Sequence, residues 1–426
     1  MKYSLFIIGV VLFIWTCSPT YQSNPIANGD ISFEPGGQEM GNCSDPLVYA
    51  PDTNMLNLRP IKTLYLNFHV MRKSDGTGSF TEKEGIRFCK GLVINGNFRL
   101  ERNEQMFLPL NNVTPALPIN FRYEIYSDPD DPDDTGIYFH NDDELYYFVK
   151  NGKNRNNYDN TVFKKYGIHK DSVLNIFILS HHPDSVASPT YKPSVTGIAF
   201  RSNIKVAGFY HSAKDTLIVD GKPFVKDAWY CQQLMNHEVG HVLGLSHTWM
   251  GNDGCDDTPN HSNCWSKTDK PPCNIRVSNN VMDYNTHQKA WTPCQLGKVN
   301  YNFSNPKSSQ RKMLKRTWCE RDPQKDLYID KPAVWNGALD LEGNVTILDG
   351  GSLEIGCRVS FPRDARLEVR PGGELILNGA TLESDCGNYW KGIFVGTYGK
   401  EKGSVRMINH PIITHTDISM ADLLKK

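Results

Sequence analysis

The sequence predicts an α/β (α+β) fold, followed by a small all-β, parallel β-helix-like domain. Segments that alternate like strands mix with segments spaced like amphipathic helices between residues 61 and 245. Short strand patterns punctuated by glycine pairs recur beyond residue 325. A chain of 426 residues with 39% hydrophobic content is long enough to fold as two or three domains.

The first residues predict export. MKYSLFIIGVVLFIWTC has a lysine and then an apolar run from Leu5 to Trp15, shorter than the roughly 20 residues that span a bilayer. Residues 1–17 are therefore expected to be the signal peptide of a secreted or bacterial cell-surface protein. Cys17 stands where a bacterial lipoprotein is lipidated, so an outer-surface lipid anchor and simple cleavage nearby both remain open. Residues 18–45 are expected to be a linker or pro-segment.

Order is expected from Ile61 onward. Amphipathic spacing predicts a helix over residues 80–100. The acidic run DPDDPDD at residues 128–134 contains two prolines and predicts a solvated loop, with a calcium site as the alternative. Alternating apolar residues predict strands at 63–71, 119–126, 173–179, 196–200 and 207–211.

A further helix is predicted over DAWYCQQLMNHEVGHVL, residues 227–243. Asp227 is suited to cap its first turn, and Gly244 to end it. His237 and His241 are four positions apart, which places their imidazoles on one helix face, one turn apart. We therefore expect both side chains to bind the same ion.

The stretch HEVGHVLGLSH, from His237 to His247, predicts a catalytic zinc site. A zinc ion that catalyses hydrolysis takes three protein ligands and leaves one position to water. Gly244 can adopt the positive φ that turns the chain, so that His247 meets the same ion. Glu238 is expected to be the general base, because zinc lowers the pKa of that water from 15.7 towards about 7.

The complete HExxHxxGxxH motif resembles the signature of metzincin peptidases, and NNVMDYN offers Met282 for the methionine turn of that class. Together with NHEVGHVLGLSHTW and CDDTP, these motifs look most like the pappalysin family, including its bacterial members of the ulilysin and cytophagalysin type. The resemblance implies a metzincin-type catalytic domain, with a twisted mixed sheet and an active-site helix, over residues 46–322.

The resemblance also implies roles for single residues. It implies zinc ligands at His237, His241 and His247, a general base at Glu238, an apolar floor at Met282 and an oxyanion-stabilising hydroxyl at Tyr284. A packed core tyrosine is the alternative for Tyr284. Calcium often accompanies such domains, and oxygen ligands that suit it are offered by Asp253, Asp256, Asp257 and Thr258. The alternative is that these side chains cap a turn.

Ten cysteines remain when Cys17 is set aside, an even number that suggests several disulfides in an exported chain. Cys43 is expected either to block the zinc in a latent form or to form a disulfide, and the odd number that a free Cys43 would leave favours the disulfide. The resemblance implies the pairs Cys255–Cys273 and Cys264–Cys294.

A repeat marks the C-terminal region. VTILDGGSLEI, beginning at Val345, recurs as LEVRPGGELIL, beginning at Leu367, 22 residues later. This pattern predicts the coils of a parallel β-helix over residues 330–426, with a small sandwich as the alternative. About three coils fit, and Cys357 and Cys386 are placed to tie neighbouring coils.

These features predict a secreted or surface-tethered zinc endopeptidase that acts on protein or peptide substrates. The alternative is a surface adhesin or structural protein whose metalloprotease domain is degenerate. The net charge of -1 gives no field that would attract nucleic acid. Four other histidines have no ligand spacing and are expected to be ordinary loop or core residues: His181, His182, His211 and His261.

Overall fold

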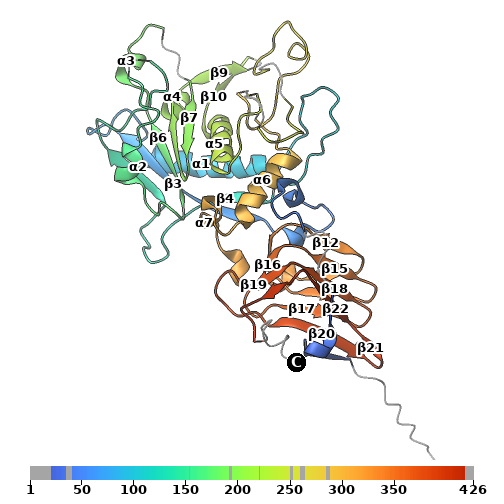
Figure 1. Ribbon diagram of the computed structural model, residues 1–426. Helices are drawn as coiled ribbons and strands as arrows, with labels where there is room; N and C mark the ends of the chain where they lie inside the picture. The colour runs from blue at the N-terminus through green and yellow to red at the C-terminus, as the bar shows by residue number, and fades with distance from the viewer. Residues whose placement is uncertain are drawn as a thin grey trace, which may run out of the picture.

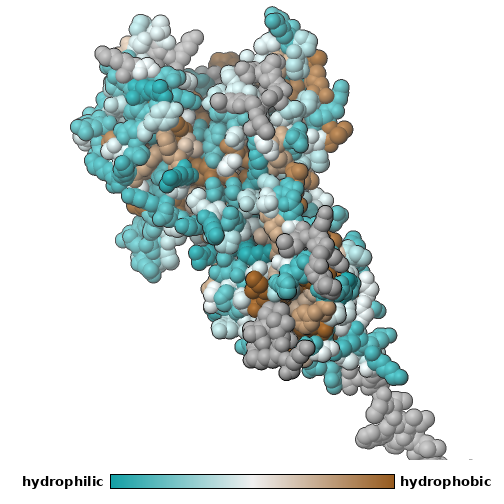
Figure 2. All heavy atoms as spheres, viewed as in Figure 1, coloured by the Kyte–Doolittle hydropathy of each residue, from teal (hydrophilic) through white to brown (hydrophobic). Residues whose placement is uncertain are grey.

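The computed structural model describes residues 21–34, 41–152, 154–190, 194–219, 221–249, 253–259, 264–284 and 288–417. The predicted signal peptide, including Cys17, lies outside these ranges, and so does His261. Within them, no helix combines the length and the apolar character needed to cross a bilayer. Hydrophilic side chains cover most of the visible face of the molecule (Figure 2).

A six-stranded sheet forms the centre of the larger part of the molecule (Figure 1). Its order is β4-β3-β6-β8-β7, and β5 pairs with β3 on the same side as β4. Every pair is parallel except β7 with β8, so β7 is an antiparallel edge strand. The strands are β3 (Lys62–Arg72), β4 (Phe121–Ile125), β5 (Ile137–Asn141), β6 (Leu174–Leu179), β7 (Thr196–Phe200) and β8 (Asn203–Ala207).

Four of the five predicted strands are confirmed as β3, β4, β6 and β7. The strand predicted at 207–211 is wrong, because β8 ends at Ala207 and α4 (Phe209–Ser212) begins at once. Gly208 between them has a φ of 87°, and a Cβ there would lie 2.5 Å from the Ser194 carbonyl oxygen. A left-handed residue in so tight a space ends the strand.

Two long helices pack against each other and against the sheet: α1 (Glu82–Leu100) and α5 (Ala228–Val242). Both match their predicted positions. Thr81 and Glu84 form a capping box at the start of α1, and the Asp227 carboxylate accepts the Trp229 amide at 2.9 Å at the start of α5. Gly96 of α1 lets the helices approach closely, because a Cβ there would lie 2.6 Å from the Met235 side chain.

Shorter elements complete this part. The helices are α2 (Thr161–Tyr166), α3 (Pro183–Val186), α6 (Pro293–Ser304) and α7 (Ser309–Lys312), and a hairpin joins β9 (Thr216–Val219) to β10 (Lys222–Val225). Single 3-10 turns are η1 (Asn28–Asp30), η2 (Pro46–Tyr49), η3 (Leu56–Leu58), η4 (Thr317–Cys319) and η5 (Pro323–Lys325).

The C-terminal region is a parallel solenoid, which confirms the β-helix prediction. Three parallel sheets form its faces, in the orders β11-β14-β17-β20, β12-β15-β18-β22 and β13-β16-β19-β23. Val345 pairs with Leu367 and Leu353 with Leu375, so the sequence repeat is the rise from one coil to the next. The stack has four coils rather than about three, because its first coil begins at Leu327, ahead of the recognisable repeat.

The solenoid strands are β11 (Leu327–Ile329), β12 (Ala333–Trp335), β13 (Leu339–Asp340), β14 (Val345–Ile347), β15 (Ser352–Ile355), β16 (Arg358–Ser360), β17 (Arg366–Val369), β18 (Glu374–Asn378), β19 (Thr381–Glu383), β20 (Gly392–Tyr398), β21 (Glu401–Lys402), β22 (Ser404–Ile408) and β23 (Ile412–Ile413).

The N-terminal segment returns to the last coil of the solenoid. β1 (Gln22–Pro25) pairs antiparallel with β20, and β2 (Ile31–Phe33) pairs parallel with β22. In Figure 1 this blue segment lies beside the red strands, at the end of the solenoid away from the six-stranded sheet. The range that the sequence presented as a linker or pro-segment therefore contains strands that cover an open sheet edge.

Disulfides differ from the expected pairs. Cys357 and Cys386 do not tie neighbouring coils to each other, because Cys357 bonds Cys43 and Cys386 bonds Cys319. Both bonds join the solenoid to segments that precede it in the chain. The buried Cys89 and Cys231 remain free thiols.

Candidate active site

Helix α5 and the turn after it bring three imidazoles together. Gly244 ends the helix with a φ of 100°, and a Cβ there would lie 2.6 Å from the Asn302 amide nitrogen. His247 is thereby carried back towards the helix. Its Nε2 atom lies 3.0 Å from Nε2 of His241 and 3.3 Å from Nε2 of His237.

Hydrogen bonds to backbone carbonyls orient two of the rings. His237 Nδ1 lies 2.8 Å from the Val281 oxygen, and His241 Nδ1 lies 2.9 Å from the Leu245 oxygen. Each Nδ1 donates its proton there, which leaves the Nε2 lone pair facing the other rings. Burial lowers the pKa of His237 to about 3 and that of His247 to about 4, so the rings are neutral ligands at neutral pH.

The triad fits a tetrahedral metal ion. Nitrogen ligands about 2.0–2.1 Å from such an ion lie about 3.3 Å from one another, close to the two separations observed here. Three imidazoles without a thiolate match the donor set of catalytic zinc rather than a closed structural site. The described residues therefore contain a histidine triad that could hold a metal ion.

Glu238 lies buried beside the triad. Glu238 is only 4% exposed. Burial raises the pKa of its carboxyl group to about 8, and the positive charge of the nearby Lys150 partly offsets this increase. Gly197 of the edge strand β7 gives it room, since a Cβ there would lie 2.5 Å from Glu238 Oε1. The carboxylate is thus confined between α5 and β7.

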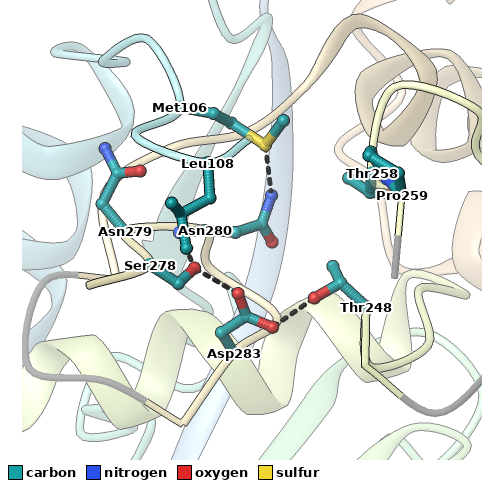
Figure 3. Close-up of a pocket in the computed structure, with 9 residues that line it drawn as sticks. All are labelled: Met106, Leu108, Thr248, Thr258, Pro259, Ser278, Asn279, Asn280 and Asp283. Atoms are coloured by element: carbon teal, nitrogen blue, oxygen red, sulfur yellow. Dashed lines mark hydrogen bonds between the residues drawn. The ribbon is translucent and has the colours of Figure 1, made fainter. Parts of the chain in front are cut away.

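Met282 lies beneath the helix that carries the ligands. It is fully buried, and a Cβ on Gly240 of α5 would lie 2.5 Å from its sulfur. The next residue, Asp283, accepts hydrogen bonds from the hydroxyls of Thr248 and Ser278 (Figure 3). Thr248 directly follows the third histidine, so Asp283 ties the ligand segment to the methionine turn.

Tyr284 lies at the open side of the site. It is 41% exposed, and its ring centre lies 4.9 Å from that of His247 and 5.6 Å from that of His237. Trp249 and Trp265 pack against it, with ring centres 4.5 and 5.3 Å away. Its exposure does not match the packed core tyrosine that was the alternative.

A cleft of about 440 Å³ opens in front of these residues. Glu238, His237 and Tyr284 line it together with the edge strand β7, including Gly197. Lys150, on the loop between β5 and α2, also lines it, and its Nζ lies 5.3 Å from the centre of the Tyr284 ring. The sequence prediction missed this lysine, because nothing in its local sequence marks a site.

The segment after the triad corrects the disulfides that the resemblance implied. Cys255 bonds Cys294 and Cys264 bonds Cys273, so the predicted connectivity is wrong. The bond between Cys43 and Cys357 likewise excludes a free Cys43 thiol that would block the metal.

Two of the acidic side chains considered for calcium, Asp253 and Asp257, serve as caps. Asp253 accepts the Cys255 amide and the Thr258 hydroxyl at 3.0 and 2.6 Å. Asp257 accepts the Thr292 hydroxyl and the Cys294 amide at 2.8 and 2.9 Å, at the N-terminus of α6. In the run at residues 128–134, Asp128 and Asp131 accept amides two residues later, as in ordinary Asx turns.

An α/β fold with a histidine triad, a buried glutamate and a methionine turn defines a metallopeptidase of the metzincin class. Residues 168–303 match the model of the peptidase family M43, described as pregnancy-associated plasma protein-A. This segment contains all three histidines, Glu238, Met282 and Tyr284, and its match supports a metallopeptidase similar to the pappalysin family.

Solved structures of mirolysin are similar to the chain, at low identity. Mirolysin in complex with a compound is 18% identical, with a TM-score of 0.40, and the match covers 60% of this chain and 96% of mirolysin. Mature mirolysin from Tannerella forsythia in complex with a cleaved peptide is 18% identical, with a TM-score of 0.38 and coverages of 60% and 95%. No curated protein matches the chain.

Proposed function

We propose that this metallopeptidase is a zinc-dependent endopeptidase of proteins, with Glu238 as its general base. The observation that carries the proposal is the convergence of three imidazole Nε2 atoms beside a buried carboxylate in an open cleft. His237, His241 and His247 would hold the zinc, which supplies a Lewis acid that polarises water and the peptide carbonyl.

Glu238 is suited to move the proton. A carboxyl group whose pKa lies near neutrality can both take a proton from water and return one to the leaving amine. Burial raises the pKa of Glu238 to about 8, and the confinement by Gly197 fixes the carboxylate at one place in the cleft. Tyr284, at the open side of the site, is suited to donate a hydrogen bond from its phenol hydroxyl to the developing oxyanion.

The edge strand β7 supports the choice of an extended peptide as substrate. It pairs with β8 on one side only within the described residues, and its other edge borders the cleft. A peptide that adds to this edge gains backbone hydrogen bonds whatever its sequence. Such binding leaves both ends of the peptide outside the cleft, as an endopeptidase requires.

A casein digestion tests the proposal. The purified chain should cut casein, lose activity to a zinc chelator and recover it when zinc is restored. Glu238→Gln should bind one zinc per chain and lower kcat by about two to four orders of magnitude. A wild-type chain that binds one zinc and cuts nothing would instead favour the alternative, a surface adhesin or structural protein whose β-rich C-terminal domain carries the function.

We also propose that the chain is exported, and that Cys17 is either lipidated or removed with the leader. Four disulfides support this, because such bonds persist in oxidising compartments. Expression in a bacterial host with labelled palmitate separates the two cases. Label that Cys17→Ser abolishes indicates an anchor, unlabelled extracellular protein indicates cleavage, and protein retained in the cytosol contradicts export.

A further inference from the structure

We propose that Lys150 forms a subsite for a carboxylate of the substrate next to the scissile bond, so that the enzyme prefers acidic peptide segments. The inference rests on the proposed endopeptidase function and names the substrate class for the same cleft.

Only the Tyr284 side chain separates Lys150 from the His247 ring. Its ammonium lies 5.3 Å from the centre of the Tyr284 ring, and that ring lies 4.9 Å from the His247 ring. Lys150 and Glu238 line the same cleft. A substrate side chain that reaches Lys150 therefore belongs to a residue close to the bond being cut.

The charge of Lys150 acts on the buried Glu238 carboxyl, whose pKa it lowers, but Lys150 makes no ion pair within the described residues. Among the described residues that line the cleft, Lys150 and Glu238 are the only members of the Lys, Arg, Asp and Glu group. None of the ion pairs found among the described residues includes Lys150. Glu238 is engaged in proton transfer under the proposed mechanism, so an anionic substrate group is the complement that this cleft lacks.

The loop that carries Lys150 is held in place before any substrate binds. The Val149 amide donates to the Asn156 side-chain oxygen at 2.7 Å, and the Asn156 amide donates to the Val149 oxygen at 3.0 Å. One residue earlier, the Phe148 amide donates to the Ser180 oxygen at 3.0 Å, and the Phe148 side chain is buried. Binding therefore orders only the lysine side chain, which keeps the entropic cost low.

Two sources supply a carboxylate to such a site: an Asp or Glu side chain, and the C-terminus of a peptide. We assign the subsite to the side chain, because the substrate strand along β7 passes through the cleft rather than ending in it. The experiment separates the two sources.

Peptide binding to zinc-loaded Glu238→Gln, measured by fluorescence anisotropy, tests the assignment without turnover. Peptides derive from a bond that the wild type cuts in casein and carry a neutral fluorophore. One set places Glu or Gln at each position flanking the bond and has an amidated C-terminus. A second set is neutral along its length and ends in a free carboxylate after the cleavage site.

We expect Glu to tighten binding by about tenfold at one flanking position, which is typical of a hydrogen-bonded charge pair. Adding Lys150→Met should remove this preference, and Lys150→Glu should transfer it to a peptide with Lys at that position. Lys307→Glu is the matched control, because Lys307 is exposed and lies outside the cleft lining. It changes the net charge by as much as Lys150→Glu does and should leave the preference intact.

Equal binding of Glu and Gln peptides would overturn the proposal, and so would a preference that survives Lys150→Met. A Lys150-dependent gain confined to the free C-terminus would overturn the side-chain assignment. Failure of the proposed function has a different signature: the wild type then cuts no casein. In that case the same Glu and Gln exchanges are tested in peptides from uncut casein, and binding to zinc-loaded Glu238→Gln still decides the role of Lys150.

Discussion

Gly197 leaves the space that the Glu238 carboxylate occupies. A Cβ at this position would lie 2.5 Å from Oε1, so Gly197→Ala must displace the carboxylate or the edge strand. Misplacing a catalytic group by about 1 Å costs on the order of 100-fold in rate. We expect kcat/KM to fall by about that factor while one zinc per chain is retained, as measured by peptide hydrolysis and metal analysis.

The control for this substitution is Gly29→Ala, because a Cβ at Gly29 meets nothing within 4 Å. It should leave both activity and zinc content unchanged. Unchanged kcat/KM in Gly197→Ala would contradict the confinement of Glu238 by β7.

At the residue scale, the sequence predicted what local spacing determines. His237 and His241 follow from helical periodicity, and Gly244 follows from the turn that His247 needs. Lys150 could not be predicted in this way. It belongs to a loop between β5 and α2, and only the packing of that loop against Ser180 at the end of β6 brings it to the cleft. Its type and neighbours in sequence carry no signal of that contact.

At the scale of elements, the N-terminal strands give the next prediction. β1 and β2 pair with the last coil of the solenoid, so their removal exposes edges of β20 and β22. A chain that begins at residue 41 keeps Cys43 but loses both strands. We expect a lower melting temperature and concentration-dependent association, measured by calorimetry and light scattering.

A chain that begins at residue 21 retains both strands and serves as the control. Equal melting temperatures and a monomeric state for both chains would show that the strands contribute nothing to the last coil. Full casein activity in the shorter chain is still expected, because neither strand lines the cleft.

Periodicity explains why one part of the solenoid was predicted and another was not. Val345 and Leu367 repeat because each coil places the same side chain in the core, and that repeat is visible in the sequence. β1 and β2 contain no buried residue, although Ile26 between them is buried, and they have no repeat, so their pairing with β20 and β22 follows only from the fold. Disulfide connectivity is non-local in the same way, and Cys255 pairs with Cys294 rather than with Cys273.

At the scale of the whole molecule, a buried ion cluster joins the two parts. Arg311 of α7 binds Asp340 of β13 through both guanidinium nitrogens, one of them at 2.9 Å, and Asp385 at 2.7 Å. Arg358 adds a bond of 2.8 Å to Asp340 and another of 2.8 Å to the Ser304 oxygen at the end of α6. The cluster therefore couples the first coil of the solenoid to the helices that follow the methionine turn.

Asp340→Asn tests this coupling through its dependence on pH. Burial alone would raise the pKa of Asp340, but Arg358 and Arg311 outweigh it and hold the pKa well below its usual range. A depressed folded-state pKa gives stability that is fully present above the unfolded-state pKa of about 3.9 and is lost as the pH falls below it. At pH 7 the variant should lose roughly 3–5 kcal/mol, because the buried Arg311 and the partly buried Arg358 lose their shared anion.

The stability difference between the wild type and Asp340→Asn should be smaller at pH 3, because the wild type has by then begun to lose the stability that the ionised carboxylate provides. Thermal unfolding of both proteins at pH 7 and pH 3 measures this difference. Asp364→Asn is the matched control, since its pair with Lys391 is exposed and worth about 0–1 kcal/mol. A gap between the wild type and Asp340→Asn that stays constant from pH 7 to pH 3 would mean that the carboxylate charge does not stabilise the junction. The junction would then depend on apolar packing and on the disulfides of Cys43 and Cys319.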